Sequence, residues 1–213
     1  MNDIKIAWDV DGTIRPRPDT TRKAILEVVG NHKILSQQEL FYQQWDEISI
    51  EAKNTGRDVF ELFLIRIGIS EEESKHLASV IKARRSSRII STQPYPELID
   101  VLKQIRSSNI IVSHNTGIDE WLRKNNLSEY FCSVIQGVSS KSEYIQGYIY
   151  VGDTISDVRD FLVANPKSNL NMFLIGNVDK MRLQSLLNQM GEDISRVIRI
   201  SKLTEMLEYL KKI

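Results

Sequence analysis

Two pairs of acidic residues have a spacing that suits metal-dependent chemistry, and the first is Asp9 and Asp11. They lie in the segment Asp-Val-Asp-Gly-Thr, directly after the apolar run 4–8. Two carboxylates two residues apart can take different roles, because one can stay ionised by binding a metal while the other exchanges a proton. Gly12 permits a sharp turn and a close approach of the backbone to a ligand. The alternative is an ordinary Asp-Gly turn between a strand and a loop.

Asp153 and Asp157 form the second pair, in the segment Gly-Asp-Thr-Ile-Ser-Asp. Asp153 follows the apolar run 148–151, and Asp157 falls in the first turn of a predicted helix. A spacing of four residues can bring the two carboxylates to one side of that helix. Carboxylate oxygens and waters suit Mg²⁺, which prefers an octahedral oxygen shell. The alternative is that Asp153 or Thr154 caps the helix and Asp157 complements its dipole.

The elements that would position these acids are short apolar strands that alternate with helices. Strands are predicted at 4–8, 110–112, 133–138, 148–151, 171–175 and 196–200, and helices at 97–107, 118–125, 157–164, 180–190 and 201–212. This alternation predicts a parallel sheet with helices on both faces. Ligands of such sheets bind outside the carboxyl ends of the strands. Asp9, Asp11, Ser113 and Asp153 are therefore expected to converge on one crevice.

A helical block interrupts this alternation between the first and second strands. About four helices are predicted there, with capping boxes at Ser36–Glu39 and Ser70–Glu73, and proline residues flank the block on both sides. The sequence therefore predicts an α/β fold with a Rossmann-like parallel sheet core and an inserted all-helical cap domain. The core comprises residues 1–14 and 94–213, and the cap comprises residues 15–93.

Composition excludes several classes of protein. The chain has 213 residues, and its 28 Lys and Arg balance its 28 Asp and Glu, whereas nucleic-acid binders usually carry a basic excess. The single cysteine, Cys132, cannot form an internal disulfide, and no Cys/His spacing suggests zinc. No secretory signal or apolar stretch of membrane-spanning length is recognised. We expect a cytoplasmic protein that binds neither nucleic acid nor membrane, and the sequence does not predict its oligomeric state.

In order, Asp9–Thr13, Ser113, Lys141 and Asp153–Asp157 resemble the four motifs of the haloacid dehalogenase (HAD) superfamily. The resemblance covers the whole chain, includes the inserted cap, and is similar to phosphoglycolate phosphatase-type members. It implies that Asp9 attacks phosphorus to form an aspartyl-phosphate. It also implies that Asp11 protonates the leaving oxygen and then activates water. An acid at position 11 is the pattern of phosphatases and mutases, whereas ATPases of the family carry Thr there and dehalogenases an aromatic residue.

The resemblance also implies Mg²⁺ as the cofactor. Its expected ligands are Asp9, the backbone carbonyl of Asp11, and Asp153, with Asp157 bound directly or through water. A cation of this kind would neutralise charge on the transferring phosphoryl oxygens.

The residues expected at the phosphoryl group and its surroundings are Thr13, Ser113, His114, Asn115 and Lys141. Ser113 and Lys141 would bind phosphoryl oxygens, and Thr13 would help to orient the nucleophile loop. His114 departs from the family pattern, because it separates Ser113 from the small polar Asn115. It either contacts the phosphate or an acidic substrate, or is tolerated at the edge of the crevice.

Three basic residues leave alternatives open. Lys141 is followed by Ser142 instead of the frequent Pro, and only eleven residues separate it from Asp153, so the usual intervening helix must be short. Its alternative is a solvent-facing lysine on a loop. Arg15 and Arg17 lie just after the nucleophile loop, where they either select an anionic substrate or are surface charges at a hinge.

The expected function is Mg²⁺-dependent hydrolysis of a small phosphate monoester through an aspartyl-phosphate, with a small phosphorylated metabolite as the substrate. A cap over the crevice favours a small substrate, because lids enclose substrates and exclude water. One alternative is a phosphosugar mutase, which shares both aspartates of the first motif. The other is a non-catalytic binding scaffold, although a scaffold has no need of all four acids.

Overall fold

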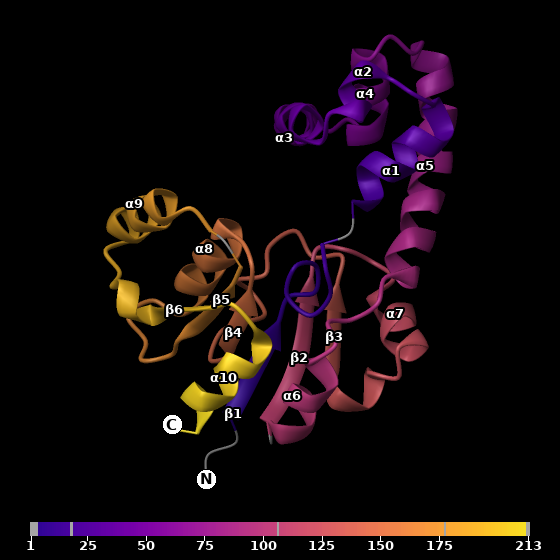
Figure 1. The fold of residues 1–213 in the computed structure, drawn as a ribbon. Helices are drawn as coiled ribbons and strands as arrows, with labels where there is room; N and C mark the ends of the chain where they lie inside the picture. Colours follow the sequence, from indigo (N-terminus) through magenta and orange to yellow (C-terminus); the bar gives the residue numbers. More distant parts are fainter. Residues whose placement is uncertain (1–3, 18, 106, 177, 212–213) are drawn as a thin grey trace. The chain divides into compact units, whose positions relative to one another are not determined.

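The computed structural model describes residues 4–17, 19–105, 107–176 and 178–211, without the side chains of residues 46, 50, 53 and 54. The chain divides into two compact units, one formed by Met1–Arg17 with Thr92–Ile213 and the other by Pro18–Ser91 (Figure 1). We call them the α/β unit and the helical unit. Arg15 and Arg17, which the sequence analysis assigned to the cap, belong to the α/β unit.

The α/β unit contains one parallel sheet. Its described strands are β1 (Ile4–Trp8), β2 (Ser107–Ser113), β3 (Ser133–Gln136), β4 (Ile149–Gly152), β5 (Met172–Ile175) and β6 (Val197–Ile200). They lie in the order β3-β2-β1-β4-β5-β6, and every described pair of neighbours is parallel. The order changes direction between β1 and β4, and sheets of this kind bind ligands at the carboxyl ends of the strands beside such a switch point.

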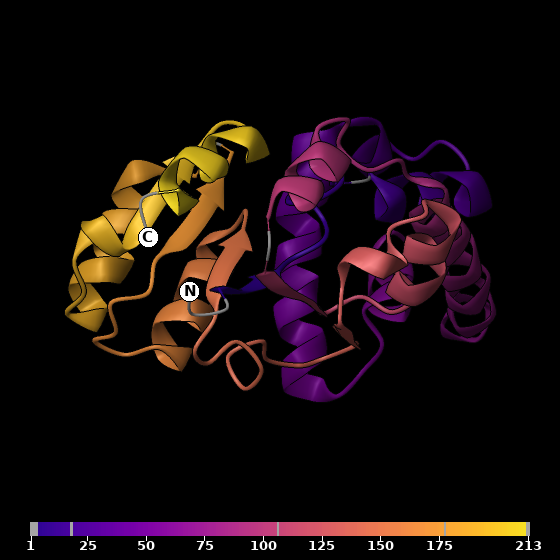
Figure 2. The same ribbon diagram turned by 90° about the horizontal axis from the view of Figure 1, so that it is seen from below.

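Helices pack on both faces of this sheet (Figure 2). One face carries α6 (Leu98–Gln104), α7 (Ile118–Lys124) and α10 (Leu203–Leu210), and the other carries α8 (Ile155–Ala164) and α9 (Lys180–Met190). Two short 3₁₀ turns, η1 (Ser128–Tyr130) and η2 (Ile194–Arg196), precede β3 and β6. The predicted α/β fold with a parallel sheet and helices on both faces is confirmed.

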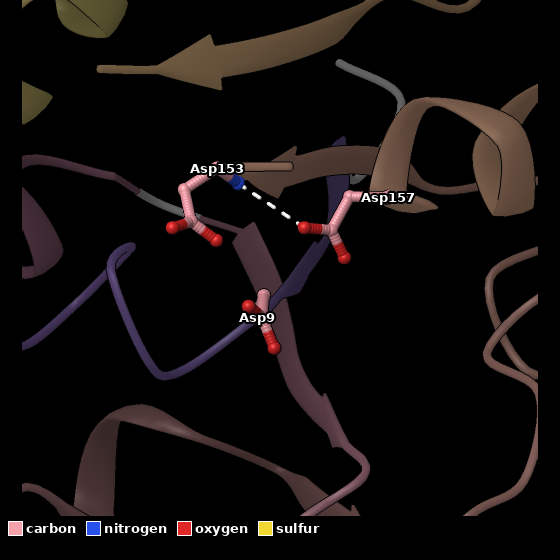
Figure 3. Close-up of side chains that lie close together, drawn as sticks. All are labelled: Asp9, Asp153 and Asp157. Carbon is pink, nitrogen blue, oxygen red and sulfur yellow. Dashed lines mark hydrogen bonds between the residues drawn. The ribbon is translucent and has the colours of Figure 1, made fainter. Parts of the chain in front are cut away.

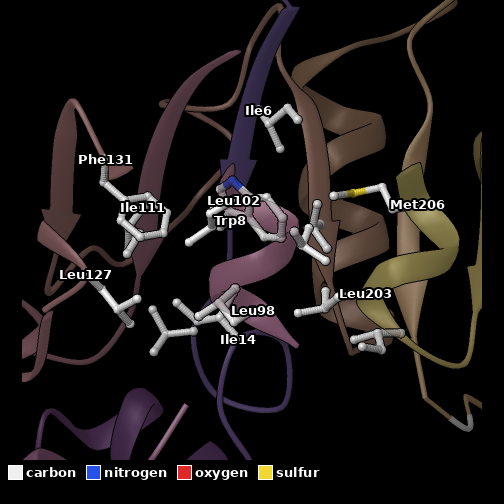
Figure 4. Packing of buried hydrophobic residues seen from close by; sticks show 14 of the residues in the cluster. Ile6, Trp8, Ile14, Leu98, Leu102, Ile111, Leu127, Phe131, Leu203 and Met206 are labelled. Carbon is white, nitrogen blue, oxygen red and sulfur yellow. The ribbon is translucent and has the colours of Figure 1, made fainter. Parts of the chain in front are cut away.

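Alternate residues of each strand enter the two layers of core. In β1, Ile6 and Trp8 face the α6–α7–α10 layer, whereas Ala7 faces the α8–α9 layer. Trp8 and Leu102 belong to the hydrophobic cluster of the first layer (Figure 4). Its indole nitrogen donates a hydrogen bond to Asn109 Oδ1 at 3.0 Å. Both faces of the sheet are buried, which explains why its strands read as nearly continuous apolar runs.

The helical unit has a hydrophobic core of its own, which includes Ile25, Phe41 and Phe63. Its described helices are α1 (Thr20–Val29), α2 (Lys33–Ser36), α3 (Gln38–Thr55), α4 (Val59–Arg66) and α5 (Glu71–Ser91). Among the residues described by the structure, no helix is long and apolar enough to cross a membrane.

Several element boundaries differ from the predicted ones. The capping box at Ser36–Glu39 is wrong, because Ser36 ends α2 and its hydroxyl donates to the carbonyl of Lys33 at 2.7 Å. Ser70 accepts the backbone N–H of Glu73 at 3.3 Å, as half of the second predicted box. In the α/β unit, β2 begins at Ser107, three residues before the predicted start. Residues 137–148, which join β3 to β4, form turns and contain no helix.

Candidate active site

The nucleophile loop turns sharply at the carboxyl end of β1. The backbone N–H of Asp9 donates to the carbonyl of Val151 at 2.9 Å, which fixes Asp9 beside β4. The carbonyl of Val10 then accepts the backbone N–H groups of residues 13, 14 and 15 at 3.0–3.2 Å. Gly12 has φ of +86°, in the left-handed region that favours glycine. A Cβ atom at Gly12 would lie 1.9 Å from Oδ2 of Asp153, so the loop approaches Asp153 more closely than any side chain allows.

Three carboxylates meet above the ends of β1 and β4. Asp9, Asp153 and Asp157 each offer an oxygen, and these atoms lie within 4.8 Å of one another (Figure 3). Burial and the charge of Asp157 raise the pKa of Asp9 to about 7, although Lys141 acts in the opposite direction. Burial likewise raises the pKa of Asp153 to about 6, against the influence of Arg17. The ionised forms of Asp9 and Asp153 are thus disfavoured, and a divalent cation beside them would favour those forms. All three residues offer the hard oxygen donors that Mg²⁺ prefers.

Lys141 lies inside this cluster, with 3% of its surface exposed. Its Nζ donates to Oδ1 of Asp9 and to Oδ1 of Asp157, each at 2.7 Å. Burial alone would lower the pKa of Lys141, but the charges of Asp9 and then of Asp157 raise it. The alternative of a solvent-facing lysine is therefore wrong. The predicted short helix is absent from this connection, and an irregular turn carries the side chain to the nucleophile instead.

Both oxygens of Asp157 accept several hydrogen bonds. Oδ2 accepts from the hydroxyl of Thr154 at 2.6 Å and from the backbone N–H groups of Thr154 and Asp153 at 3.0 and 3.3 Å. This is the capping box of α8, so the capping alternative from the sequence analysis describes this oxygen. Oδ1 accepts from Lys141 and from the hydroxyl of Tyr150 at 2.9 Å. Burial opposes ionisation, yet Lys141 and these hydrogen bonds lower the pKa of Asp157.

Asp11 is held by a cation on one oxygen and an amide on the other. Nε of Arg15 donates to Oδ1 of Asp11 at 2.6 Å, and the side-chain amide of Asn115 donates to Oδ2 at 2.5 Å. Arg15 is fully buried, and its guanidinium carbon lies 4.7 Å from the ring centroid of Trp121. The interpretation of Arg15 as a surface charge at a hinge is therefore wrong.

The other predicted phosphate-site residues have mostly local contacts. Ser113 is buried at the end of β2, and its Oγ accepts the backbone N–H of Asn115 at 3.1 Å. His114 is exposed, and its Nδ1 lies 2.7 Å from the carbonyl of Val138. Thr13 is fully buried, and its hydroxyl has no hydrogen-bond partner within the described part of the chain.

Two residues make contacts in the site that the sequence did not predict. Arg17 reaches Asp153, with Nη2 at 3.0 and 2.9 Å from the two carboxylate oxygens. The hydroxyl of Tyr150 supports Asp157 from β4. A signal for Tyr150 exists in the sequence, because a tyrosine within a buried strand usually needs a partner for its hydroxyl. Arg17 offers no such signal.

No protein-family model matches the chain. One curated protein matches by sequence, a glyceraldehyde 3-phosphate phosphatase from Methanopyrus kandleri, at 28% identity over 125 residues. The match covers 54% of this chain and 53% of that protein, so it spans about half the length of the relative.

Solved structures resemble the chain over nearly all of its length. A phosphatase candidate from Clostridium difficile has a TM-score of 0.67 at 13% identity and covers 97% of this chain and 99% of its own. A candidate HAD-type hydrolase from Bacillus subtilis, solved with bound magnesium, has a TM-score of 0.66 at 16% identity, with coverage of 99% and 100%. A candidate beta-phosphoglucomutase from Thermotoga maritima has a TM-score of 0.62 at 15% identity and covers 99% of both chains. The chain thus has the fold of the HAD-like hydrolases, and the predicted resemblance is confirmed for the fold.

Proposed function

We propose that this chain, with the fold of the HAD-like hydrolases, is a Mg²⁺-dependent phosphatase that hydrolyses a small phosphate monoester through an aspartyl-phosphate on Asp9. The observation that carries the proposal is the surroundings of Asp9. It follows β1 directly, Nζ of Lys141 lies 2.7 Å from its Oδ1, and Asp153 and Asp157 each place a carboxylate oxygen within 4.8 Å of one of its own. The HAD fold alone would not suffice, because function resides in the site and not in the fold.

Asp9 is the proposed nucleophile, and Asp9 with Asp153 would hold the cation. Mg²⁺, when bound, supplies positive charge that screens the carboxylates from an anionic phosphoryl group. Covalent catalysis divides a very slow hydrolysis into two steps, since Asp9 first takes the phosphoryl group and water then removes it.

Asp11 is the proposed acid and base. It would give a proton to the leaving oxygen in the first step and accept one from the attacking water in the second. The contacts with Arg15 and Asn115 fix the direction of its carboxylate before substrate binds. Ser113, His114 and Thr13 keep their predicted roles near the phosphoryl group as part of the proposal.

Lys141 would neutralise charge on the phosphoryl oxygens, and Asp157 would act mainly by positioning Lys141. A carboxylate offers about four lone-pair sites, and Asp157 already accepts five hydrogen bonds. We therefore assign Asp157 to the support of Lys141 and of the Asp153 backbone, and expect water between Asp157 and any cation.

The class of substrate is supported by the curated relative, whose name describes a phosphatase for a small phosphorylated aldehyde. The assignment of the helical unit as a cap stays a prediction. A phosphosugar mutase is the second candidate, because one similar structure is a beta-phosphoglucomutase candidate and mutases share both aspartates of the first motif. A mutase would return the phosphoryl group to a sugar, whereas a phosphatase releases orthophosphate.

The test is a phosphate-release screen over small phosphorylated metabolites, with Mg²⁺ and with excess chelator. We expect turnover of at least one metabolite with Mg²⁺ and none with chelator. Asp9→Asn should abolish turnover because an amide is a poor nucleophile, whereas Asp100→Asn, an exposed acid on α6, should be unaffected. Turnover that persists in Asp9→Asn, or in verified metal-free protein, would exclude this mechanism.

A further inference from the structure

Arg17 forms an ion pair with a carboxylate that the proposed function assigns to the cation. A single nitrogen, Nη2, lies 3.0 and 2.9 Å from the two oxygens of Asp153. The side chain of Asp153 is 15% exposed, whereas that of Arg17 is 57% exposed. The carboxylate of Asp153 is therefore largely buried in the site. The guanidinium of Arg17 extends into solvent, where it has room to move.

The second arginine of the same loop provides the contrast. Arg15 is fully buried, packs against Trp121 and is bound to Asp11. Packing on all sides fixes the position of Arg15, so its guanidinium cannot move to another partner. The side chain of Arg17 is 57% exposed instead, and its guanidinium donates to both oxygens of Asp153.

A divalent ion and the guanidinium would compete for Asp153. Both need the oxygens of the same carboxylate, and two positive charges a few ångströms apart repel each other. Mg²⁺ carries twice the charge and binds carboxylate oxygens at short distance, so it would displace an exposed guanidinium, whose ion pair is weak. The displaced group would remain near the nucleophile, because Arg17 follows the nucleophile loop in the chain and the charge of Asp11 also acts on it.

We propose that Arg17 is an exchangeable cation of this site, which neutralises Asp153 until a divalent ion binds and then turns to the anionic group beside Asp9. The first half concerns the metal alone, and the second rests on the proposed phosphatase function, which supplies a phosphoryl group there. A guanidinium suits this exchange, since its fork of donors fits carboxylate and phosphate oxygens equally well.

The exchange makes Arg17 a coupling element between two ligands. In the wild type, the metal releases Arg17 for the anion, so the metal strengthens anion binding beyond direct charge attraction. By linkage, the anion must strengthen metal binding by the same factor. Removing the guanidinium should lower the factor by which metal and anion strengthen each other's binding. The direct attraction between metal and anion would remain.

The experiment measures binding without turnover. Free Mn²⁺ is followed by electron paramagnetic resonance during titration of wild type, Arg17→Ala and Arg17→Lys, with Arg182→Ala, an exposed arginine on α9, as the control for losing one charge. Orthophosphate binding is then measured by calorimetry at saturating Mn²⁺. We expect Arg17→Ala to bind Mn²⁺ about threefold to tenfold more tightly and phosphate about tenfold more weakly. Arg17→Lys should lie between Arg17→Ala and wild type, and Arg182→Ala should match wild type.

Two results would overturn the inference. If Mn²⁺ binds Arg17→Ala within twofold of wild type, Arg17 does not compete for Asp153. If Mn²⁺ binding tightens but phosphate binding does not change, the guanidinium does not turn to the anion. The outcome is separate from that of the activity screen, because a protein with this exchange and no phosphate release would contradict the phosphatase function and leave the role of Arg17 toward metal and anion intact.

Discussion

Asp9 is a carboxyl group whose surroundings oppose the charge that its proposed role requires. Its pKa of about 7 in the folded protein, against 3.8 as the ordinary value, follows first from burial and then from the charge of Asp157. The folded state therefore holds a proton that the unfolded state has lost between these two pH values. In metal-free protein this contribution to stability falls as pH rises from about 4 to about 7, and it stays constant at higher pH.

The first prediction follows from this sign. Asp9→Asn replaces the destabilised carboxylate by a neutral group of the same shape. The metal-free variant should therefore unfold at a higher temperature than metal-free wild type at about pH 8. At about pH 5 the two proteins should unfold at nearly the same temperature. Each kcal/mol corresponds to about 2–4 °C for a protein of this size. Thermal unfolding in chelator measures the difference, with Asp100→Asn as control. A variant less stable than wild type at the higher pH would contradict it.

A second prediction at the residue scale concerns Lys141. Lys141→Met keeps most of the volume but leaves Asp9 and Asp157 without their buried cation, so we expect stability to fall by about 3 kcal/mol. We also expect kcat/KM to fall by at least about two orders of magnitude, or roughly 2.7 kcal/mol of transition-state stabilisation. Kinetics with a circular-dichroism check of folding measure both effects.

Tyr150→Phe is the matched comparison for Lys141→Met. It removes one hydrogen bond to Asp157 and keeps the ring in the core, so a loss of about 1 kcal/mol in stability and less than about tenfold in kcat/KM is expected. If Lys141→Met loses less than threefold in kcat/KM while folded, another cation serves the phosphoryl group.

At the scale of elements, the site depends on a strand end and a helix start that approach each other closely. Gly12 turns the chain after β1, and Thr154 with Asp157 caps α8 after β4. A cap of this kind stabilises a helix by about 1 kcal/mol. Here the same residues also fix the positions of the carboxylates. A change that destabilises this backbone is therefore expected to disturb the geometry of the site.

The prediction at this scale is that Gly12→Ala damages the site beyond its backbone strain. Its Cβ would lie 1.9 Å from Oδ2 of Asp153, so the carboxylate must move, whereas Gly147, with φ of +79°, has nothing within 4 Å of an added Cβ. Gly147→Ala should therefore show only the strain of a left-handed backbone, about 1 kcal/mol. Gly12→Ala should lose more stability and also bind Mn²⁺ at least about tenfold more weakly. Equal Mn²⁺ affinity in the two variants would contradict the close approach of loop and carboxylate.

At the scale of the whole molecule, two units with separate hydrophobic cores share one chain. All described members of the candidate site, including Arg17, belong to the α/β unit. A ligand stabilises the structure that it binds. The effect of the cation should therefore be confined to the unit that supplies its ligands.

Hydrogen exchange tests this separation. We expect Mg²⁺ to slow amide exchange in β1, β4 and the start of α8, and to leave the helices between residues 20 and 91 unchanged, because units with separate cores open independently. Asp9→Asn should weaken the response to Mg²⁺ in the α/β unit. Equal slowing in both units would show that they open as one cooperative structure.

The sequence determined the architecture and the main acids of the candidate site. Strand and helix periodicity are local properties. Short segments of sequence therefore predict the alternation of strands and helices along the chain, and this alternation indicates a parallel sheet. Asp9 and Asp153 are predictable for the same reason, since each directly follows an apolar strand and parallel strands end on one edge. The start of β2 and the N-cap of α3 differ from the prediction. At α3, neighbouring polar residues compete for the same capping role.

Only the tertiary structure decided which charges meet. The bond between Lys141 and Asp9 joins residues 132 positions apart, and that between Arg17 and Asp153 joins residues 136 apart. Arg15 and Arg17 stand two residues apart in the sequence, yet one is buried against Trp121 and the other extends toward solvent. No periodicity encodes such a difference. Long basic side chains reach their partners across space, and the partner is set by how strands and irregular loops pack around each carboxylate.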